Sequence, residues 1–487
     1  MGSEIQEFRL EDCMEAIIDY RGKTPKKTNS GIPLITAKII KNGRIQPVGE
    51  FIAEDDYEAW MTRGFPKAGD IVLTTEAPLG EVAQLDGKKI ALAQRVITLR
   101  GKQGLLDNDY LLFLMQSRDV QHQLDGRGTG STVKGIKQSE LRELILRFPS
   151  IDKQKKIAQH LTSIDHKIAL NREINQTLEQ MAQALFKSWF VDFDPVIDNA
   201  LDAGFFDAAT NSELDSLPPA LIARAELRKT ARASDGFQAL PDHVRQLFPS
   251  AFEDSQEPSV GVNGWVPMGW EVTKLENLIG IKHGYAFKGE YFSENATNDI
   301  LLTPGNVKVG GGFKSDKYKF YSGPLVSDYI FKAGDIFVNM TDLSKASDTL
   351  GYPSVVPNYE GLTFHHNQRL GKVSFSDHPC ATKEFIYQTL CSNNYRNSVL
   401  GSATGTTVKH TAPKKILSYI LVCSRVGSIE KIFNEQAGAL MQKTYENESS
   451  SRVLSKLRDT LLPKLISGEL RLDSPEVTQA KALVDAE

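Results

Sequence analysis

The chain contains two copies of one unit, and this duplication restricts its possible folds more than any other feature. KAGDIVLTT begins at Lys67, and KAGDIFVNM begins at Lys332. Further along, the run GSTVK at residues 130–134 returns as GTTVK at residues 405–409, and Gln94-Arg95 returns as Gln368-Arg369. The offset between matching residues grows slowly from 265 to 275, as expected when loops absorb insertions. We therefore expect the same fold twice.

The first part of each copy is rich in predicted strands. In the first copy, Gly and Pro punctuate short apolar runs that start at Ile32, Asp70 and Ala93. One helix is predicted from Asp109 to Asp125, with its counterpart near Lys383 to Leu400. We therefore expect a β-rich head at residues 1–150 and another at residues 264–427.

The second part of each copy is a long helix, predicted at residues 151–190 and 428–472. Its apolar residues recur at alternating steps of four and three, a period typical of coiled coils. Both seams are polar in the middle, and these matching positions indicate that the helices pair with each other; the alternative is that each helix packs only on its own head. The predicted seam residues are Ile157, Leu161, Ile164, Ile168, Asn171, Asn175, Leu178, Leu185, Phe433, Leu440, Asn447, Leu454, Leu461 and Leu465.

Two further segments lie outside this pattern. Residues 191–263 carry 13 acidic and 5 basic side chains, so this segment nets −8 while the whole chain nets −4. A helix is predicted there from Pro219 to Ala233, and the segment is either a docking surface for a partner or a tether for the second head. Pro463 should kink or end the second long helix nearby, and residues 473–487 are predicted to form a mobile tail.

Composition excludes several classes of protein. No stretch of about 18 uncharged apolar residues is present, so a membrane-spanning helix is excluded, and the N-terminus lacks the apolar region of a secretory signal. The four cysteines include no CxxC pair, so their spacing indicates neither a zinc site nor a disulfide framework. The expected location is the reducing cytoplasm. Net acidity argues against nucleic acid only weakly, because it is concentrated between the copies and the second head nets +4.

No catalytic constellation emerges from the sequence. The position of the first phosphate-loop glycine before Gly22-Lys23 holds Ile17, and no glycine-rich turn for a methyl-donor cofactor is found. His365 and His366 are adjacent, so on a strand their side chains point to opposite faces and make poor joint metal ligands. Asp70 and Asp335 follow glycine and open strands, which is typical of turn residues. We expect no catalytic, cofactor or metal site.

Each head carries a basic, hydroxyl-rich loop, and a second basic cluster lies near its start. Lysine, hydroxyl and exposed glycine amide groups suit phosphate oxygens, whereas Arg, Lys and Asn suit base edges. The alternative is that the glycines only form turns and the lysines only solvate the surface. The candidate DNA-binding residues are Arg21, Lys23, Thr24, Lys26, Lys27, Thr74, Thr75, Arg95, Arg127, Thr129, Ser131, Thr132, Lys134, Lys137, Lys282, Tyr285, Lys288, Asn306, Lys308, Asn339, Lys345, Arg369, Thr404, Thr406, Thr407, Lys409 and Lys414.

Several motifs occur in an order that resembles the specificity subunits of type I restriction-modification systems. They include GKTP at residues 22–25, the two Gly-Asp-Ile strands, WFVDFDP at residues 189–195 and LPKLISGEL at residues 462–470. The resemblance covers nearly the whole chain. One departure is that residues 282–288 of the second copy, KHGYAFK, replace the Gly-x-Thr-Pro turn, which is expected if the two heads bind different sequences.

The resemblance implies an α+β fold with two β-rich target-recognition domains in pseudo-twofold repeat, separated by two long helices in an antiparallel coiled coil. It implies a non-catalytic subunit that binds double-stranded DNA at a split, asymmetric target, one half-site per head. Residues 153–190 would span about 57 Å, enough to separate heads one DNA turn, about 34–36 Å, apart. Two methylation subunits and the restriction subunits would dock on it and supply S-adenosylmethionine, ATP and Mg²⁺ chemistry. Two alternatives stay open: a self-contained DNA methyltransferase or nuclease component, and a coiled-coil scaffold without DNA contact.

Overall fold

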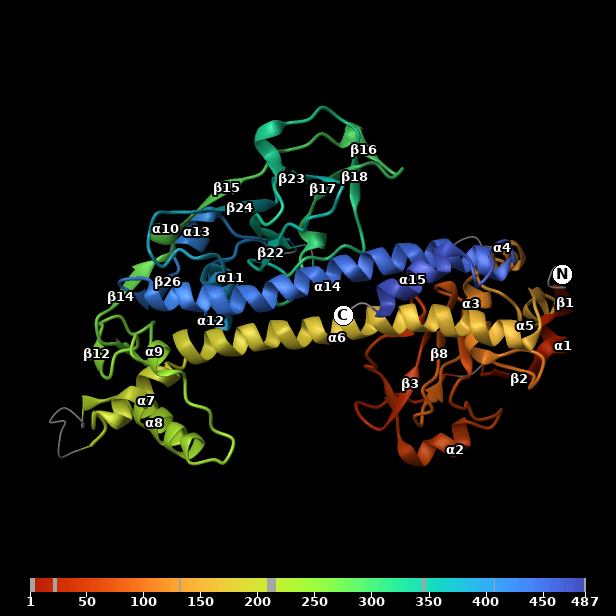
Figure 1. Ribbon diagram of the computed structural model, residues 1–487, viewed down its shortest axis with the longest axis horizontal. Helices are drawn as coiled ribbons and strands as arrows, with labels where there is room; N and C mark the ends of the chain where they lie inside the picture. Colours follow the sequence, from red (N-terminus) through yellow and green to blue (C-terminus); the bar gives the residue numbers. More distant parts are fainter. Residues whose placement is uncertain are drawn as a thin grey trace. The chain divides into compact units, whose positions relative to one another are not determined.

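The chain divides into two compact units. The structure, a computed structural model, describes residues 5–20, 24–130, 133–207, 216–342, 344, 347–406 and 408–485. Unit 1 combines Met1–Arg172 with Ser450–Glu487, and unit 2 is Glu173–Ser449. Each unit contains one β-rich head and a segment of each long helix, α6 (Ile151–Phe190) and α14 (Ser428–Ile466) (Figure 1).

The head of unit 1 is built on a four-stranded antiparallel sheet of order β2-β10-β7-β8. A second sheet, β6-β3-β9, contains the parallel pair β3–β9, and β1 pairs with β11. The apolar runs predicted as strands are β3, β7 and β10. The strand bounds are β1 Gln6–Arg9, β2 Met14–Asp19, β3 Ile32–Ile35, β4 Ile40–Lys41, β5 Arg44–Ile45, β6 Phe51–Ile52, β7 Ile71–Thr75, β8 Leu79–Gln84, β9 Ala91–Leu92, β10 Val96–Gly101 and β11 Ile145–Phe148.

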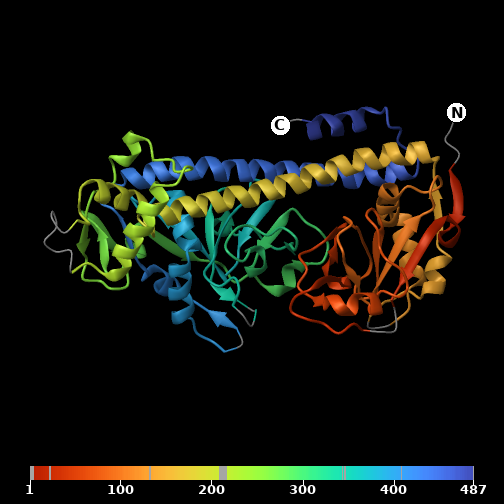
Figure 2. The same ribbon diagram turned by 90° about the horizontal axis from the view of Figure 1, so that it is seen from below.

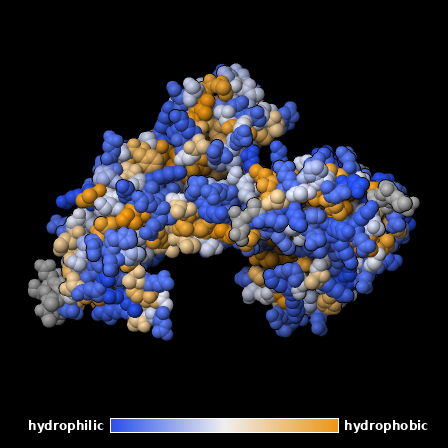
Figure 3. Space-filling model, in the orientation of Figure 1, coloured by the Kyte–Doolittle hydropathy of each residue, from blue (hydrophilic) through white to orange (hydrophobic). Residues whose placement is uncertain are grey.

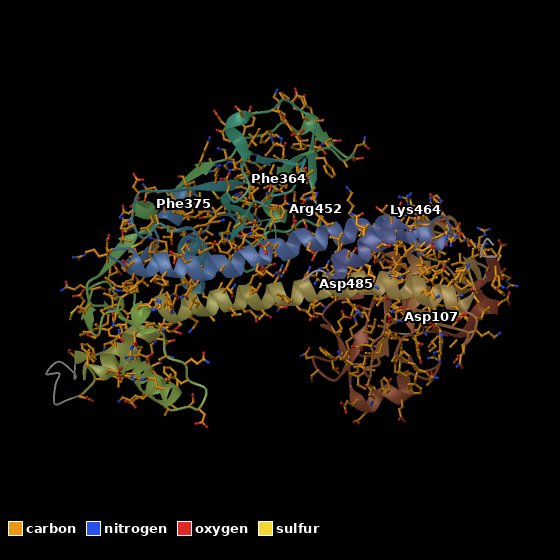
Figure 4. All side chains as sticks on the ribbon, in the orientation of Figure 1. Asp107, Phe364, Phe375, Arg452, Lys464 and Asp485 are labelled. Carbon is orange, nitrogen blue, oxygen red and sulfur yellow. The ribbon has the colours of Figure 1, made fainter. Side chains whose placement is uncertain are left out.

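The head of unit 2 repeats this topology. Its antiparallel sheet β15-β24-β20-β22 matches β2-β10-β7-β8, and its parallel pair β17–β23 matches β3–β9. A second core there surrounds Phe364, labelled in Figure 4. The strand bounds are β12 Phe252–Asp254, β13 Trp265–Pro267, β14 Trp270–Lys274, β15 Ile279–His283, β16 Phe292–Ser293, β17 Asp299–Leu302, β18 Lys319–Tyr321, β19 Ile330–Phe331, β20 Ile336–Asn339, β21 Thr341–Asp342, β22 Pro353–Val355, β23 Thr363–His366, β24 Leu370–Phe375, β25 Lys409–His410 and β26 Ile420–Ser424.

The helix predicted from Asp109 to Asp125 is in fact two helices. Ser117 ends the first, and its side chain accepts a hydrogen bond from Val120 N, which caps the second. Ser392 makes the same break in unit 2, where its side chain accepts from Tyr395 N. The head helices are α1 Leu10–Cys13, α2 Tyr57–Trp60, α3 Asn108–Gln116, α4 Arg118–Arg127 and α5 Gln138–Arg142, then α10 Leu275–Leu278, α11 Lys383–Cys391, α12 Asn393–Ser402 and α13 Pro413–Leu417.

The long helices run antiparallel and pair through the predicted seam. In unit 1, Ile157, Leu161 and Ile164 of α6 share a buried core with Leu454, Leu461 and Leu465 of α14. The polar positions meet as well: Asn171 Nδ2 donates to Ser451 Oγ at 3.1 Å in unit 1, and Asn447 Nδ2 donates to Asn175 Oδ1 at 2.8 Å in unit 2. Leu178, Leu185 and Leu440 are only half-buried, and the remaining seam residues are buried. The prediction that the helices pair is confirmed. In each unit the paired helix segments also pack on the head of that unit.

Residues 191–263 are folded rather than a tether in the part that the structure describes. They form α7 (Asp194–Asp202), α8 (Pro219–Arg232) and α9 (Asp242–Arg245), so the predicted helix at Pro219 is present. Val196, Ile197 and Leu221 belong to the main core of unit 2, together with Trp189 of α6. Residues 208–215 lie outside the described part of the chain.

The prediction of a mobile tail after residue 473 is wrong for residues 475–485. They form α15 (Pro475–Asp485), which lies alongside α6 in Figure 2. Val477 and Ala480 are buried in the core of unit 1 near Leu161 and Leu465. The sequence signal is weak because only a few apolar side chains, Val477, Ala480 and Val484, dock this short helix. Pro463 lies within α14, which ends three residues later at Ile466.

Candidate nucleic-acid interface

Each head ends in a tight loop that carries the basic, hydroxyl-rich sequence, here called the Gly/Thr loop (residues 129–135 in unit 1 and 404–410 in unit 2). Two reciprocal backbone hydrogen bonds close the first loop, between Thr129 and Gly135, at 2.8 and 2.9 Å. The same two bonds join Thr404 and His410 at 3.0 and 2.9 Å. Gly130 and Gly405 have φ of +118° and +99°, a region that disfavours other residues, so glycine is required at both turns. The loop residues Ser131, Thr132 and Thr407 lie outside the described residues.

A ladder of backbone hydrogen bonds joins the Gly/Thr loop of unit 1 to the other candidate segments. Ile136 N, after the loop, donates to Thr75 O, and Thr75 N donates to Arg95 O, both at 3.0 Å. Thr24 Oγ1 donates to Gln94 Oε1 at 3.2 Å, which brings the start of the head to the same place. We call this edge of the head, formed in unit 1 by residues 24–27, 75–76, 94–95, 127–130 and 133–137, the rim.

The rim recurs in unit 2 with different side chains. Thr411 N donates to Met340 O, and Met340 N donates to Arg369 O, both at 3.0 Å. Tyr285 takes the place of Thr24: its backbone N donates to His366 O, and Gln368 N donates to its carbonyl, both at 2.9 Å. The departure from the Gly-x-Thr-Pro turn therefore changes the chemistry of the rim but not its framework.

The rim carries exposed cations and hydroxyls in both units. Lys134 and Arg127 are partly neutralised by Asp125 at 2.5 Å and Glu140 at 3.2 Å. Exposed candidates are Thr24, Lys26, Lys27, Arg95, Thr129, Lys134, Lys137, Lys282, Tyr285, Lys288, Arg369, Thr404, Thr406 and Lys414, and Arg127 and Lys409 are half-buried. Surface ion pairs contribute little free energy, so phosphate can replace these carboxylates. Arg21, Lys23 and Lys345 lie outside the described residues.

Five candidates do not present a free side chain at the rim. Thr74, Thr75, Asn306 and Asn339 are buried, and a buried side chain cannot reach DNA without local unfolding. Asn306 Nδ2 donates to the carbonyls of Lys314 and Lys317, and Asn339 Nδ2 donates to Thr349 Oγ1, so both stabilise turns. Lys308 Nζ lies 3.5 Å from Glu448 Oε1 of α14 and joins the head of unit 2 to that helix. The burial of the first four side chains argues against direct DNA contact by them, whereas for Lys308 the prediction stays a prediction.

An aromatic group extends the rim of unit 2, and the sequence analysis missed part of it. Tyr285 is 42% exposed and its ring centroid lies 5.4 Å from that of Tyr329. Lys282 Nζ lies 4.5 Å from the centroid of Tyr329 and donates to Asp328 O at 2.9 Å. Tyr329 comes from a short 3-10 turn about 45 residues away in sequence, so no local pattern could have identified it. Two adjacent tyrosine rings, tilted by 44° to one another beside a lysine, are suited to contact nucleotide bases and phosphates.

The predicted turn roles of Asp70 and Asp335 are confirmed. Asp70 Oδ2 accepts from Lys67 N at 2.8 Å, and Asp335 Oδ2 accepts from Lys332 N at 2.7 Å. Asp70 is also bound by the guanidinium of Arg100, with both hydrogen bonds at 2.7 Å. These carboxylates are therefore committed to the fold.

Known proteins share both the sequence pattern and the fold. Residues 2–180 match the family model described as the type I restriction modification DNA specificity domain. The chain is 29% identical to the HindI specificity subunit of Haemophilus influenzae, over 74% of this chain and 76% of that one, and 25% identical to the MjaIX specificity subunit of Methanocaldococcus jannaschii, over 91% and 87%. By these matches the chain is similar to the specificity subunits of type I restriction-modification systems.

The fold agrees with this family. The crystal structure of the type I restriction-modification S subunit from M. genitalium matches 95% of this chain and 96% of its own, with a TM-score of 0.50 and 14% sequence identity. At that identity the likeness concerns the fold alone. The matched structure therefore supports the fold of two β-rich heads and two long helices. Among the residues that the structure describes, no helix is long and apolar enough to cross a membrane.

Proposed function

We propose that the chain is the DNA-reading subunit of a type I complex, in which each head binds one half of a split, asymmetric target. The single observation that supports this most strongly is the rim, which occurs twice on the same framework but with different side chains. A conserved framework with altered surface chemistry is what two readers of different sequences require. The proposal also draws on the family, whose named relatives are specificity subunits.

In this proposal the paired helices set the distance between the half-sites. A helix of 40 residues such as α6 is about 60 Å long at 1.5 Å per residue, longer than the roughly 34–36 Å of one DNA turn. The outer faces of α6 and α14 then serve as docking surfaces for two methylation subunits and the restriction subunits. Their surface is mixed, with hydrophilic areas beside apolar ones, and α6 exposes Leu170, Ile174 and Met181 (Figure 3).

The chain itself is proposed to be non-catalytic and to act in the cytoplasm. S-adenosylmethionine, ATP and Mg²⁺ belong to the partner subunits in this assignment. Methylation of a base within a duplex requires that the base be flipped out of the stack, so the rims would hold DNA that the partner distorts.

The test is selection of duplexes from a random-sequence pool by the purified full-length chain, followed by sequencing. Enrichment of two short motifs at a fixed separation is expected. Each phosphate contact contributes about 0.9 to the slope of log K against log salt, so Lys137→Ala and Lys414→Ala should each reduce that slope by about 0.9. Lys88→Ala is the matched control. Lys88 is also exposed, but it follows the end of β8 that pairs with Ile71, whereas the rim lies at the other end of this strand pair, beside Glu76.

Three outcomes would contradict the proposal. Salt-independent affinity would show that the rims do not contact phosphate. Methyl transfer from S-adenosylmethionine by the pure chain would favour a self-contained enzyme. An unchanged target after the head of unit 2 is exchanged for that of another specificity subunit would favour a scaffold without DNA contact.

A further inference from the structure

The base of the head of unit 2 brings together one imidazole and two thiols. His378, Cys380 and Cys423 each offer one ligand atom, and these atoms all lie within 4.8 Å of one another. Cys423 is on β26 and Cys380 is in the loop between β24 and α11, 43 residues earlier in the chain. Both cysteines are fully buried, and the side chain of His378 is 18% exposed. In this part of the chain the sequence spacing indicated no site, because the fold alone makes these residues neighbours.

We propose that His378, Cys380 and Cys423 bind Zn²⁺ as three protein ligands, with water at the fourth tetrahedral position. Two thiolates and an imidazole are ligands that zinc prefers, whereas Mg²⁺ prefers oxygen ligands such as carboxylates. With zinc–sulfur bonds of about 2.3 Å, two sulfurs on one tetrahedral ion lie about 3.8 Å apart. The present separations therefore need to close by about 1 Å at most.

The orientation of His378 supports this assignment. Its Nδ1 accepts a hydrogen bond from Cys380 N at 3.2 Å, so the lone pair of Nδ1 faces the loop that holds Cys380. Its Nε2 lies 3.7 Å from Glu271 Oε2, which favours a proton on that nitrogen. A zinc ligand whose other ring nitrogen faces a carboxylate is the usual arrangement at such sites. To bind the ion, Nδ1 would give up the hydrogen bond from Cys380 N, while Glu271 would position the ring from the side of Nε2.

The electrostatic surroundings favour a cation. Glu271 lies directly opposite Cys423 in the β14–β26 ladder. Glu430, in the first turn of α14, is fully buried and accepts from Ser424 N and Ser424 Oγ, next to Cys423. Cys380 Sγ donates to Ser424 O at 2.6 Å, and this hydrogen bond is lost when the thiol binds an ion. Zinc binding therefore releases two thiol protons to solvent.

Unit 1 provides an internal comparison, because the same part of its fold closes without these groups. Leu10 N donates to Leu144 O there, and Leu275 N donates to Tyr419 O here, which fixes the correspondence of the two strand pairs. The positions that match Glu271, His378, Cys380, Cys423 and Glu430 hold Gln6, Gln103, Leu105, Phe148 and Gln154. Phe148 is fully buried, and Gln154 fills its place with neutral hydrogen bonds to backbone carbonyls. The fold does not require thiols here, so their presence in unit 2 needs a separate reason.

Zinc at this site would join three segments of unit 2. It would tie the loop before α11 to β26, and the buried contact of Ser424 with Glu430 continues to the start of α14. The head would thereby be fixed to the helix that follows it. This role is independent of whether the rim binds DNA.

The experiment measures metal in the full-length chain with any affinity tag removed. The reduced protein is loaded with ZnCl₂, dialysed, and analysed by mass spectrometry for elements. About one zinc per chain is expected, with at least a tenfold loss of affinity in Cys423→Ala and His378→Ala, and about tenfold in Glu271→Gln. Cys13→Ala is the matched control, since Cys13 is also fully buried and donates to a backbone carbonyl, Leu10 O.

A second measurement separates loss of the site from loss of the fold. Co²⁺ in place of zinc should give the wild-type chain the strong absorption of a cobalt–thiolate bond, which needs no variant. Absence of that absorption, or zinc content in the Cys380→Ala/Cys423→Ala double variant equal to that of the wild type, would overturn the proposal.

Discussion

The polar layer in the seam of unit 2 allows a quantitative test of how the two long helices are paired. Asn447 Nδ2 donates to Asn175 Oδ1 at 2.8 Å, and Asn175 Nδ2 donates to Thr444 O at 3.1 Å, with both asparagines buried. Asn175→Leu removes both hydrogen bonds, each worth about 0.5–1.5 kcal/mol, and takes from the buried Asn447 amide the acceptor it uses in this pair. The added leucine contact recovers only part of this loss. We expect unit 2 to lose about 2 kcal/mol.

The second substitution reverses the effect. In Asn175→Leu/Asn447→Leu both polar partners are gone, and two leucines meet where an amide pair was. Replacing both partners by apolar groups is nearly neutral or stabilising, so the double variant should return to within about 1 kcal/mol of the wild type. The coupling between the two positions is then about 2 kcal/mol or more. The register of the helices should become less specific, because polar seam residues fix it.

Thermal unfolding followed by tryptophan fluorescence measures these differences. Trp189 and Trp270 are buried in the core of unit 2, so emission reports mainly on that unit. A loss of 2 kcal/mol corresponds to about 4–8 °C for a unit of this size. Gln176→Leu, at the exposed neighbouring position, is the control and should change stability by less than about 0.5 kcal/mol. Additive effects of the two Asn substitutions, within about 0.5 kcal/mol, would refute the paired polar layer.

Three further substitutions test other parts of the fold. Asp70→Asn should cost unit 1 about 3 kcal/mol, because it removes the charge that pairs with Arg100. Hydrogen exchange of the β7 and β10 amides measures this loss, and a loss under about 1 kcal/mol would contradict the prediction. Burial raises the pKa of Glu384, so the neutral carboxyl favours the folded state at low pH, and this contribution is lost as the pH rises through the raised pKa. Glu384→Gln, which keeps the side chain neutral, should therefore raise the melting temperature more at about pH 8 than at about pH 4. Equal shifts at the two pH values would argue against this reasoning. Val477→Asp buries a carboxylate beneath α15, so hydrogen exchange in residues 475–485 should accelerate strongly, while unchanged protection would mean that α15 is not docked through this side chain.

Much of the fold follows from patterns that repeat within the sequence. The 3.5-residue period identified both long helices, and the matching polar positions correctly indicated that they pair. The same approach failed at α15, where Val477 and Ala480 are buried in the core and Val484 packs against it, too few apolar positions to show a clear period in the sequence. It also merged α3 and α4, because the hydroxyl of Ser117 acts as a cap only once the backbone has turned.

The candidate site was predictable at the level of segments but not of side chains. The Gly/Thr loops and the turns that hold Arg95 and Arg369 do share one edge in each head. Asn306 and Asn339 were chosen because asparagine suits base edges, yet both are used inside the head to satisfy backbone groups. A single sequence does not separate these uses, since an exposed asparagine that binds a base and a buried one that closes a turn occupy similar places after a strand.

The acidic segment between the copies illustrates why formal charge describes a surface poorly. Its arginines are all engaged inside the segment: Arg228 and Arg232 with Asp198, Arg232 and Arg245 with Asp202, and Arg224 with Asp192. These contacts with Arg232 and Arg245 hold the pKa of Asp202 below its usual range, so that carboxylate stays ionised within the fold. The basic groups are thus used to bind α8 and α9 to α7, and the surplus of carboxylates is what remains on the outside. In an unfolded tether, acidic and basic side chains would be equally exposed to solvent. This folded segment instead exposes mainly carboxylates, so its surface charge is opposite to that of the cationic rims.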